Sequence, residues 1–327
     1  MNPFSYSRVT DAADAISRVR DGRGARCIAG GTDLLQLLQE RVEDADELLD
    51  LNDLPIRGIS SSIDGIHIGA LTTLADVADD PTVRDQLPVV AEALGETASP
   101  QVRNMATMGG NLLQRTRCPY FRDRAVPCNK RDPGTGCPAI DGQNRMHAIF
   151  GGSEHCIAVQ PSDLAVALVA LDAEILVSSG TERSIKVEDL YRLPGETPHV
   201  DTVLDPGEII TAIVIPASAT KLRSRYFKVR DRASFEWALA SAAVAIDVDP
   251  DGRVQDLRIA VGGVATKPWR LRNVEAALAN RVLDAEAIFE ARGLAAGGAE
   301  SHGRNAYKVP MLQGIVARAL SVVGERT

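Results

Sequence analysis

The sequence has no long hydrophobic run, no excess of basic residues, and only one cysteine outside a single region. No stretch of about eighteen apolar residues occurs, so we expect no membrane span. The net charge of −8 and the pI near 5.3 argue against nucleic acid as a partner, because phosphate binding needs a basic face. The N-terminus lacks the apolar core of a secretory signal. This predicts a cytoplasmic location, or a periplasmic one if a partner with its own signal carries the chain across.

Several catalytic and nucleotide-binding signatures are also missing. The chain has no H-E-x-x-H motif, no Ser-His-Asp order that can be defended, and no G-x-G-x-x-G fingerprint. The five histidines are scattered, and His147 and His155 flank the cysteine region. We interpret these two as surface or packing residues rather than as hydrogen-bond donors to sulfur. We therefore expect no catalytic residue in this chain.

Four of the five cysteines surround one segment rich in proline and glycine: Cys118, Cys128, Cys137 and Cys156. A loop as long as residues 115–147 is costly to order without a staple, and four thiolates on one inorganic centre could supply it. The segment has seven basic and three acidic residues, which suggests a local anion such as an iron–sulfur or zinc centre. Structural zinc usually takes close cysteine pairs, whereas these gaps span nine, eight and eighteen residues. The spacing favours a cluster over zinc, and the expected compartment disfavours disulfides.

The hydrophobic patterns mix strands and helices without a repeat, which predicts an α+β protein in three sections with boundaries near residues 55 and 220. Asp64-Gly65 predicts a hairpin turn. One long helix is expected over about 82–98, and Ser162 is expected to cap another.

Two glycine pairs, Gly30-Gly31 and Gly109-Gly110, could approach an anion closely. Glycine has no Cβ, so its backbone N–H groups can turn toward phosphate without obstruction. Side-chain donors stand beside both pairs: Thr32, Thr107 and Asn111. Two such loops could hold the two phosphates of a dinucleotide between them.

Taken in order, these segments resemble the FAD-binding subunit of the molybdenum hydroxylases, the xanthine dehydrogenase family. The resemblance covers essentially the whole chain and rests on AGGTDLL, SPQVRNMATMGGNLL, the cysteine loop, SEHCIAVQPSDLAVALVALDA and RYFKVRDRASFEWALASAAVAI. The cysteine insertion resembles the flavin subunits that carry an extra [4Fe-4S] cluster. These occur in bacterial aldehyde oxidoreductase heterotrimers and, more distantly, in 4-hydroxybenzoyl-CoA reductase.

The resemblance implies a fold and a division into domains. The fold would be a two-part FAD-binding domain of the vanillyl-alcohol-oxidase (PCMH) type, followed by a C-terminal α+β domain of sheet and helices. The first FAD-binding subdomain would span residues 1–55. The second would span 56–220 and contain the cluster loop at about 114–157. The C-terminal domain of the molybdenum-hydroxylase flavoproteins would span 221–327.

The resemblance also implies the cofactor contacts. The loop 26–34 would wrap FAD through backbone amides, Asp163 would lie near the adenosine or ribityl hydroxyls, and Lys228 would lie near the flavin ring. The Cys27 side chain itself would pack as a small hydrophobe. The full set of FAD contacts would be Arg26, Cys27, Ile28, Ala29, Gly30, Gly31, Thr32, Asp33, Leu34, Thr107, Gly109, Gly110, Asn111, Asp163, Ile210 and Lys228. The irons would be bound by Cys118, Cys128, Cys137 and Cys156.

The function implied is that of an electron-transfer subunit. A large partner subunit would hold the molybdenum cofactor and oxidise the substrate, most simply an aldehyde. A small partner with two [2Fe-2S] clusters would pass electrons to FAD, and an external acceptor would receive them. Alternatives are a subunit of a hydroxybenzoyl-CoA-reductase-like or xanthine-dehydrogenase-like complex, a free-standing flavin oxidase, and a zinc-stapled module without flavin.

Overall fold

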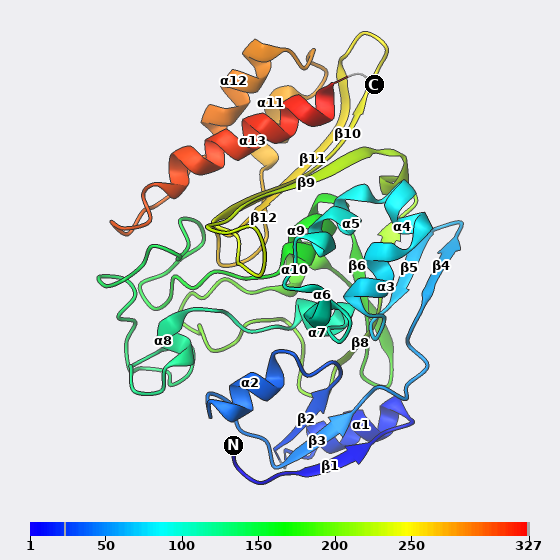
Figure 1. The fold of residues 1–327 in the computed structure, drawn as a ribbon, viewed down its shortest axis with the longest axis vertical. Coiled ribbons are helices and arrows are strands. Elements are labelled where there is room, and N and C mark those ends of the chain that lie inside the picture. The colour runs from blue at the N-terminus through cyan, green and yellow to red at the C-terminus, as the bar shows by residue number, and fades with distance from the viewer. Residues whose placement is uncertain (23, 326–327) are drawn as a thin grey trace.

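The computed structural model describes residues 1–22 and 24–325, and it arranges them around three separate sheets (Figure 1). The N-terminal sheet has three strands, the central sheet five and the C-terminal sheet four. Figure 1 shows the N-terminal sheet at the bottom of the view and the C-terminal sheet with its helices at the top. The predicted mixture of strands and helices is confirmed.

The N-terminal sheet is parallel, with strand order β1-β3-β2. Its elements are β1 (Ser5–Arg8), α1 (Ala12–Arg20), β2 (Ala25–Ile28), α2 (Leu34–Gln39) and β3 (Glu47–Asp50). Consecutive residues of β3 are buried on opposite faces, because Leu49 packs with α1 residues and Leu48 packs with Leu38 of α2. The sheet therefore holds α2 and the loop before it in place.

The central sheet is antiparallel, with strand order β4-β5-β8-β6-β7. Its strands are β4 (Ile59–Ser62), β5 (Gly65–Gly69), β6 (Glu174–Ser178), β7 (Glu182–Lys186) and β8 (Ile209–Pro216). The predicted hairpin joins β4 to β5, and Gly65 has a φ of +142° that favours glycine. Most of the largest hydrophobic cluster of the molecule packs around this sheet and its helices.

Seven helices of the described chain belong to this central part. They are α3 (Leu74–Asp79), α4 (Pro81–Gln86), α5 (Pro88–Gly95), α6 (Pro100–Arg103), α7 (Met108–Leu112), α9 (Asp163–Ala170) and α10 (Val187–Leu190). The single helix expected over 82–98 is wrong. The chain breaks at Leu87 (φ −135°, ψ 51°), because Pro88 disfavours helical backbone at the residue before it. Ser162 caps α9 as predicted, since its Oγ accepts the Ala165 N–H at 2.9 Å.

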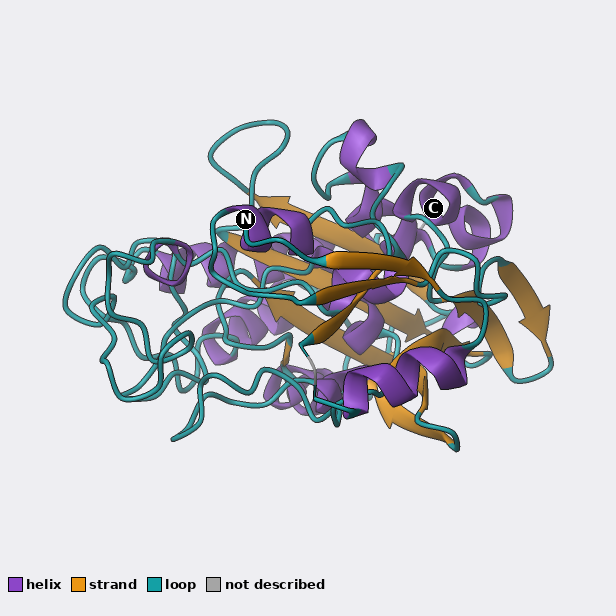
Figure 2. Cartoon of the chain, turned by 90° about the horizontal axis from the view of Figure 1, so that it is seen from below, coloured by secondary structure: helices purple, strands orange, loops and turns teal. Residues whose placement is uncertain are grey.

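Residues 113–162 are mostly loop, with the short helix α8 (Pro119–Arg122), and they gather at the left of Figures 1 and 2. The C-terminal part of the chain holds the far end of this segment. Asn305 donates to the Ala148 carbonyl at 2.9 Å, and Lys308 donates to the Met146 carbonyl at 3.0 Å. The loop is therefore ordered by hydrogen bonds from a distant helix and the turn before it.

The C-terminal sheet is antiparallel, with order β12-β11-β10-β9. Its elements are β9 (Arg223–Val229), β10 (Ala240–Val248), β11 (Val254–Gly262), β12 (Trp269–Arg270), α11 (Arg272–Leu278), α12 (Ala285–Leu294) and α13 (Lys308–Gly324), preceded by the 3₁₀ turn η1 (Ala219–Lys221). Helices α11 and α13 pack against its strands, as do α5 and α9 of the central part. Strand β10 is consequently buried from Ala240 to Ile246, which explains why every residue of this stretch except Ser241 is apolar.

Candidate functional site

The first glycine loop connects β2 to α2 and meets the second loop through its backbone. Gly31 has a φ of +69°, which glycine adopts without steric cost. A Cβ built on Gly30 would lie only 1.9 Å from the carbonyl oxygen of Met105, just before the second loop. Because that neighbour is backbone, no side-chain rotation can make room. Glycine is therefore required at position 30 for the two loops to approach.

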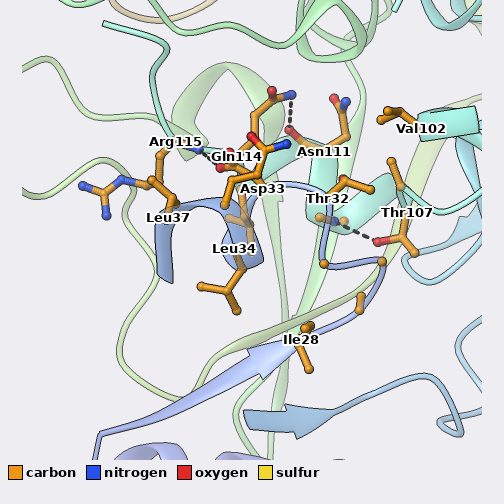
Figure 3. A pocket seen from close by; sticks show the side chains of 18 of the residues that line it. Ile28, Thr32, Asp33, Leu34, Leu37, Val102, Thr107, Asn111, Gln114 and Arg115 are labelled. Atoms are coloured by element: carbon orange, nitrogen blue, oxygen red, sulfur yellow. Dashed lines mark hydrogen bonds between the residues drawn. The ribbon is translucent and has the colours of Figure 1, made fainter. Parts of the chain in front are cut away.

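The second glycine loop forms the start of α7. Thr107 caps this helix, and its Oγ1 accepts the Gly110 N–H at 3.3 Å (Figure 3). The Asn111 side chain is buried, and its Oδ1 accepts a hydrogen bond from Ser162 Oγ at 2.6 Å. This bond ties the loop to the start of α9, so the loop is rigidly placed.

Both glycine loops line one cavity of about 580 Å³. Figure 3 shows Thr32 and Asp33 of the first loop facing Thr107 and Asn111 of the second. A volume of this size lies within the range of about 300–1,000 Å³ found for small-molecule and cofactor sites. The wall also includes Leu37 of α2, Val102 of α6, Gln114 and Arg115 after α7, Ile210 of β8, and Trp237 after β9.

Asp33 gathers three arginines of the cysteine segment at this cavity. Its carboxylate accepts the backbone N–H of Arg115 at 2.8 Å and Nη2 of Arg122 at 2.8 Å, and it pairs with Nη1 of Arg117 at 2.6 Å. The Arg117 guanidinium also lies over the Trp237 ring, 4.6 Å from its centroid. All five residues line the cavity, so its wall combines apolar surface with paired charge.

Two further basic residues of the cysteine segment pair with acidic side chains outside it. Lys130 pairs with Asp201, and Arg145 pairs with Asp231 at 2.8 Å. Acidic side chains from distant segments therefore neutralise much of the local positive charge, which the local sequence could not reveal. That this charge complements a bound anion stays a prediction.

Asp163 and Lys228 form a buried ion pair outside the cavity. Lys228 Nζ lies 2.7 Å from Asp163 Oδ2, and the two side chains are 1% and 3% exposed. Tyr226 Oη donates to Asp163 Oδ1 at 2.6 Å, and Thr97 Oγ1 donates to Oδ2 at 3.2 Å. Lys228 also donates to the Glu96 carbonyl at 3.0 Å. This pair joins β9 to α9, and of these residues Thr97 lines the cavity wall.

Lys228→Met should lower the free energy of unfolding by about 3 kcal/mol, because it leaves the Asp163 carboxylate buried without its cation. This loss of unfolding free energy is at the low end of the range for breaking a buried ion pair, because the Tyr226 and Thr97 hydroxyl groups still donate to Asp163. Chemical denaturation measures it. The matched control is Arg225→Met on the same strand, whose side chain is 48% exposed and pairs with Glu92. That change should cost less than about 1 kcal/mol. Equal losses in the two variants would contradict the assignment.

The four clustered cysteines line one small cavity of about 10 Å³, and all are free thiols. Burial raises the pKa of Cys118 to about 12 and that of Cys156 to about 11, and it also raises the pKa of Cys137. Thiols with such pKa values stay protonated at neutral pH unless a cation takes the place of the proton. Within residues 1–22 and 24–325, no group of three or more His, Cys, Asp or Glu side chains is arranged to hold a single metal ion.

The two histidines beside the cysteines differ in their surroundings. His147 is 2% exposed, and its Nε2 lies 3.2 Å from Cys118 Sγ. Burial, with a smaller contribution from Lys308, lowers the pKa of His147 to about 4. His155 is half-exposed and its Nε2 lies 2.9 Å from Glu196. His147 is therefore packed inside the protein against sulfur, and His155 lies nearer the surface; a hydrogen bond donated from His147 to sulfur is the alternative that the sequence alone ranked second.

Most of the predicted FAD contacts line the large cavity, and Arg26, Asp163 and Lys228 do not. The Arg26 side chain is half-exposed and lies 3.9 Å from Glu43. Contact of these residues with FAD stays a prediction. Sequence reasoning missed Arg117 and Trp237 in the wall. Arg117 precedes a predicted ligand, Cys118, and this adjacency was a usable signal; Trp237 lies in a loop without any pattern.

Comparison with known proteins assigns the family. The family described as “FAD binding domain in molybdopterin dehydrogenase” matches residues 2–218. The chain belongs to the FAD-binding subunits of the molybdenum hydroxylases. The family described as “CO dehydrogenase flavoprotein C-terminal domain” matches residues 225–323 of this FAD-binding subunit. The predicted family and the prediction of FAD as a cofactor are confirmed.

Individual relatives agree with this assignment. The FAD-binding subunit is 46% identical over 293 residues to the aldehyde oxidoreductase FAD-binding subunit PaoB of Escherichia coli, covering 89% of each chain. It is 31% identical to the glyceraldehyde dehydrogenase medium chain of Sulfolobus acidocaldarius, covering 83% of this chain and 79% of that one. A chain of carbon monoxide dehydrogenase from Hydrogenophaga pseudoflava superposes with a TM-score of 0.76 at 26% identity, covering 99% of this chain and 98% of that one. The FAD-binding subunit is thus part of an oxidoreductase family.

Across the described part of the chain, no helix is both long enough and apolar enough to cross a membrane.

Proposed function

We propose that this FAD-binding subunit holds FAD and a [4Fe-4S] cluster and transfers electrons within a molybdenum-dependent aldehyde oxidoreductase. The observation that carries the proposal is the short separation of the two cavities along the chain. Arg117 lines the large cavity, and the next residue, Cys118, lines the cysteine cavity. Consecutive Cα atoms lie about 3.8 Å apart, so groups held against these two residues would be close neighbours, which suits electron transfer between them.

The residues of the large cavity fit FAD. Two glycine loops approach each other so closely at Gly30 that a Cβ has no place. The first loop can present backbone N–H groups to phosphate. In the second loop the Gly109 and Gly110 N–H groups are bonded to the Ala70 carbonyl and to Thr107 Oγ1, so that loop contributes the shape of the wall. The leucine, isoleucine and tryptophan side chains of the wall offer apolar surface to ring systems. When bound, FAD supplies two-electron chemistry and an iron–sulfur cluster supplies one-electron chemistry.

The four cysteines fit the donor set of a [4Fe-4S] cluster. All four cysteines have free thiols and line one cavity. In such a cluster each thiolate binds a different iron, so the sulfurs need not converge on one point. Structural zinc does need that convergence, with ligands at about 2.0–2.3 Å from one centre. The donor set and its arrangement therefore support the cluster over a zinc staple.

The proposed substrate class and partners follow from the relatives. Two of them are named for aldehyde substrates, at 46% and 31% identity. The “Xanthine dehydrogenase FAD-binding subunit” of Escherichia coli O157:H7 is 25% identical. Both “subunit” and “medium chain” are names for parts of larger complexes. We accordingly propose a large partner with the molybdenum cofactor that oxidises the aldehyde, a small partner with two [2Fe-2S] clusters, and an external electron acceptor.

The test is a cofactor assay of the anaerobically purified chain. We expect about one flavin with about four irons and about four acid-labile sulfides per chain. Flavin with zinc and no sulfide would show that the cysteine loop is a structural staple. The chain alone should not oxidise aldehydes, because we find no catalytic residue in it. Aldehyde oxidation by the isolated chain would show instead that it is a free-standing flavin oxidase.

A further inference from the structure

We propose that His147 is a positioning residue that donates a hydrogen bond from Nε2 to the Cys118 sulfur and thereby raises the reduction potential of the cluster. This inference rests on the proposed function, because it concerns a sulfur assigned there to a [4Fe-4S] cluster. It assigns a role to a residue outside the four proposed ligands. His147 would bind no iron and would instead adjust the reduction potential of the cluster.

The contact is placed by the fold and not by local sequence. His147 and Cys118 are separated by 29 positions, yet Nε2 and Sγ lie 3.2 Å apart. The His147 backbone is held on both sides, since its N–H donates to the Asn144 carbonyl at 2.9 Å and its carbonyl accepts Asn305 Nδ2 at 3.4 Å. Asn305 is fully buried and also donates to the next carbonyl, that of Ala148. The His147 backbone is therefore held in place, and the buried ring has no hydrogen-bond partner at Nδ1 among residues 1–22 and 24–325, which leaves the contact with sulfur as its one polar contact there.

The chemistry of the two atoms sets the direction of the hydrogen bond. A thiolate bound to iron has no proton and can only accept, so the contact requires the proton on Nε2. A donor to a cluster sulfur stabilises negative charge there. Reduction adds negative charge, so the donor favours the reduced cluster and raises its potential.

His155 offers an internal comparison. It lines the same cysteine cavity, but its ring is half-exposed and its Nε2 bonds to Glu196 instead of sulfur. A histidine near the cluster therefore does not by itself make the proposed contact. Cys118 is also the cysteine that adjoins Arg117 in the wall of the FAD cavity, so this donor acts on the ligand beside the proposed electron path.

The experiment measures the cluster midpoint potential, by redox titration followed by electron paramagnetic resonance, in the anaerobically purified full chain. His147→Phe keeps a ring but removes the donor, and His147→Gln can keep an N–H donor near the sulfur. His155→Phe is the matched control. We expect a lower midpoint potential for His147→Phe with unchanged iron content, a smaller shift for His147→Gln, and the wild-type potential for His155→Phe.

Each outcome decides the inference. Wild-type potential in His147→Phe with an intact cluster overturns it, as does an equal shift in His155→Phe. If His147→Phe loses iron while His147→Gln keeps iron and a near-wild-type potential, the donor role is supported. Loss of iron in both variants would show a structural role for the ring and overturns the inference. Wild-type protein without iron overturns the proposed function itself, which is a distinguishable result.

Discussion

Gly30→Ala should strip the chain of FAD, lowering the flavin bound per chain by about tenfold or more. The new Cβ would sit 1.9 Å from the Met105 carbonyl oxygen and 2.7 Å from its carbon, so the two glycine loops must separate. Overpacking by a side chain typically costs about 1–3 kcal/mol, and here the clash is with backbone that cannot rotate away. A tenfold loss of affinity corresponds to about 1.4 kcal/mol, which lies within that cost. The measurement equilibrates the protein with free FAD below the wild-type dissociation constant, where the flavin bound per chain is proportional to affinity.

The control for this change is Gly314→Ala on α13, where an added Cβ meets nothing within 4 Å. That variant should keep its full flavin, and it gains helix propensity of about 0.5–1 kcal/mol. Circular dichroism must show that both variants are folded. A folded Gly30→Ala protein with wild-type flavin content would refute the assignment of the loop contact to FAD binding.

Cys118→Ala should abolish the cluster while flavin remains, because Cys118 lines the cysteine cavity and not the large one. Iron should fall from about four per chain to less than about one, with parallel loss of sulfide, since an alanine at one corner leaves an iron without its thiolate. Iron and sulfide analysis, together with the visible absorption of the cluster, measures the change.

Cys27→Ala is the matched control, since it removes the fifth cysteine, which lies in β2 and outside the cysteine cavity. Burial raises the pKa of Cys27 to about 11, as expected of a thiol that packs as a small hydrophobe. This variant should keep its iron. Unchanged iron in Cys118→Ala, or equal loss in Cys27→Ala, would exclude the proposed set of ligands.

The features of the site that depend on residues close together in the chain could be predicted from the sequence. The glycine pairs at 30–31 and 109–110 both line the cavity. Gly31 adopts a positive φ and a Cβ at Gly30 would clash with backbone, so the first pair depends on the chemistry of glycine itself. The four cysteines stand in a segment too poor in apolar residues to order itself, and all four reach one cavity. The hairpin at Gly65 and the cap at Ser162 belong to the same class, because each depends on a few neighbouring residues.

Other features depend on residues that are distant in the chain. Asp163 and Lys228 were predicted as separate FAD contacts, yet the structure pairs them with each other across 65 positions. Arg117 stacks on Trp237 and binds Asp33, a meeting of three segments that no local pattern announces. The length of the helix predicted over 82–98 was overestimated for a different reason. The apolar spacing continues past Pro88, but the helical backbone is interrupted at Leu87.

The sequence by itself determined the α+β class, the family, the two glycine loops and the cysteine segment. These follow from backbone freedom, hydrophobic period and residue chemistry, which act over a few positions. Only the tertiary structure decided which side chains share a cavity, that Arg117 and Cys118 line different cavities, and that His147 lies against sulfur. Those relations arise when three sheets and their helices pack to bury apolar surface, and this packing brings together residues that the chain keeps far apart.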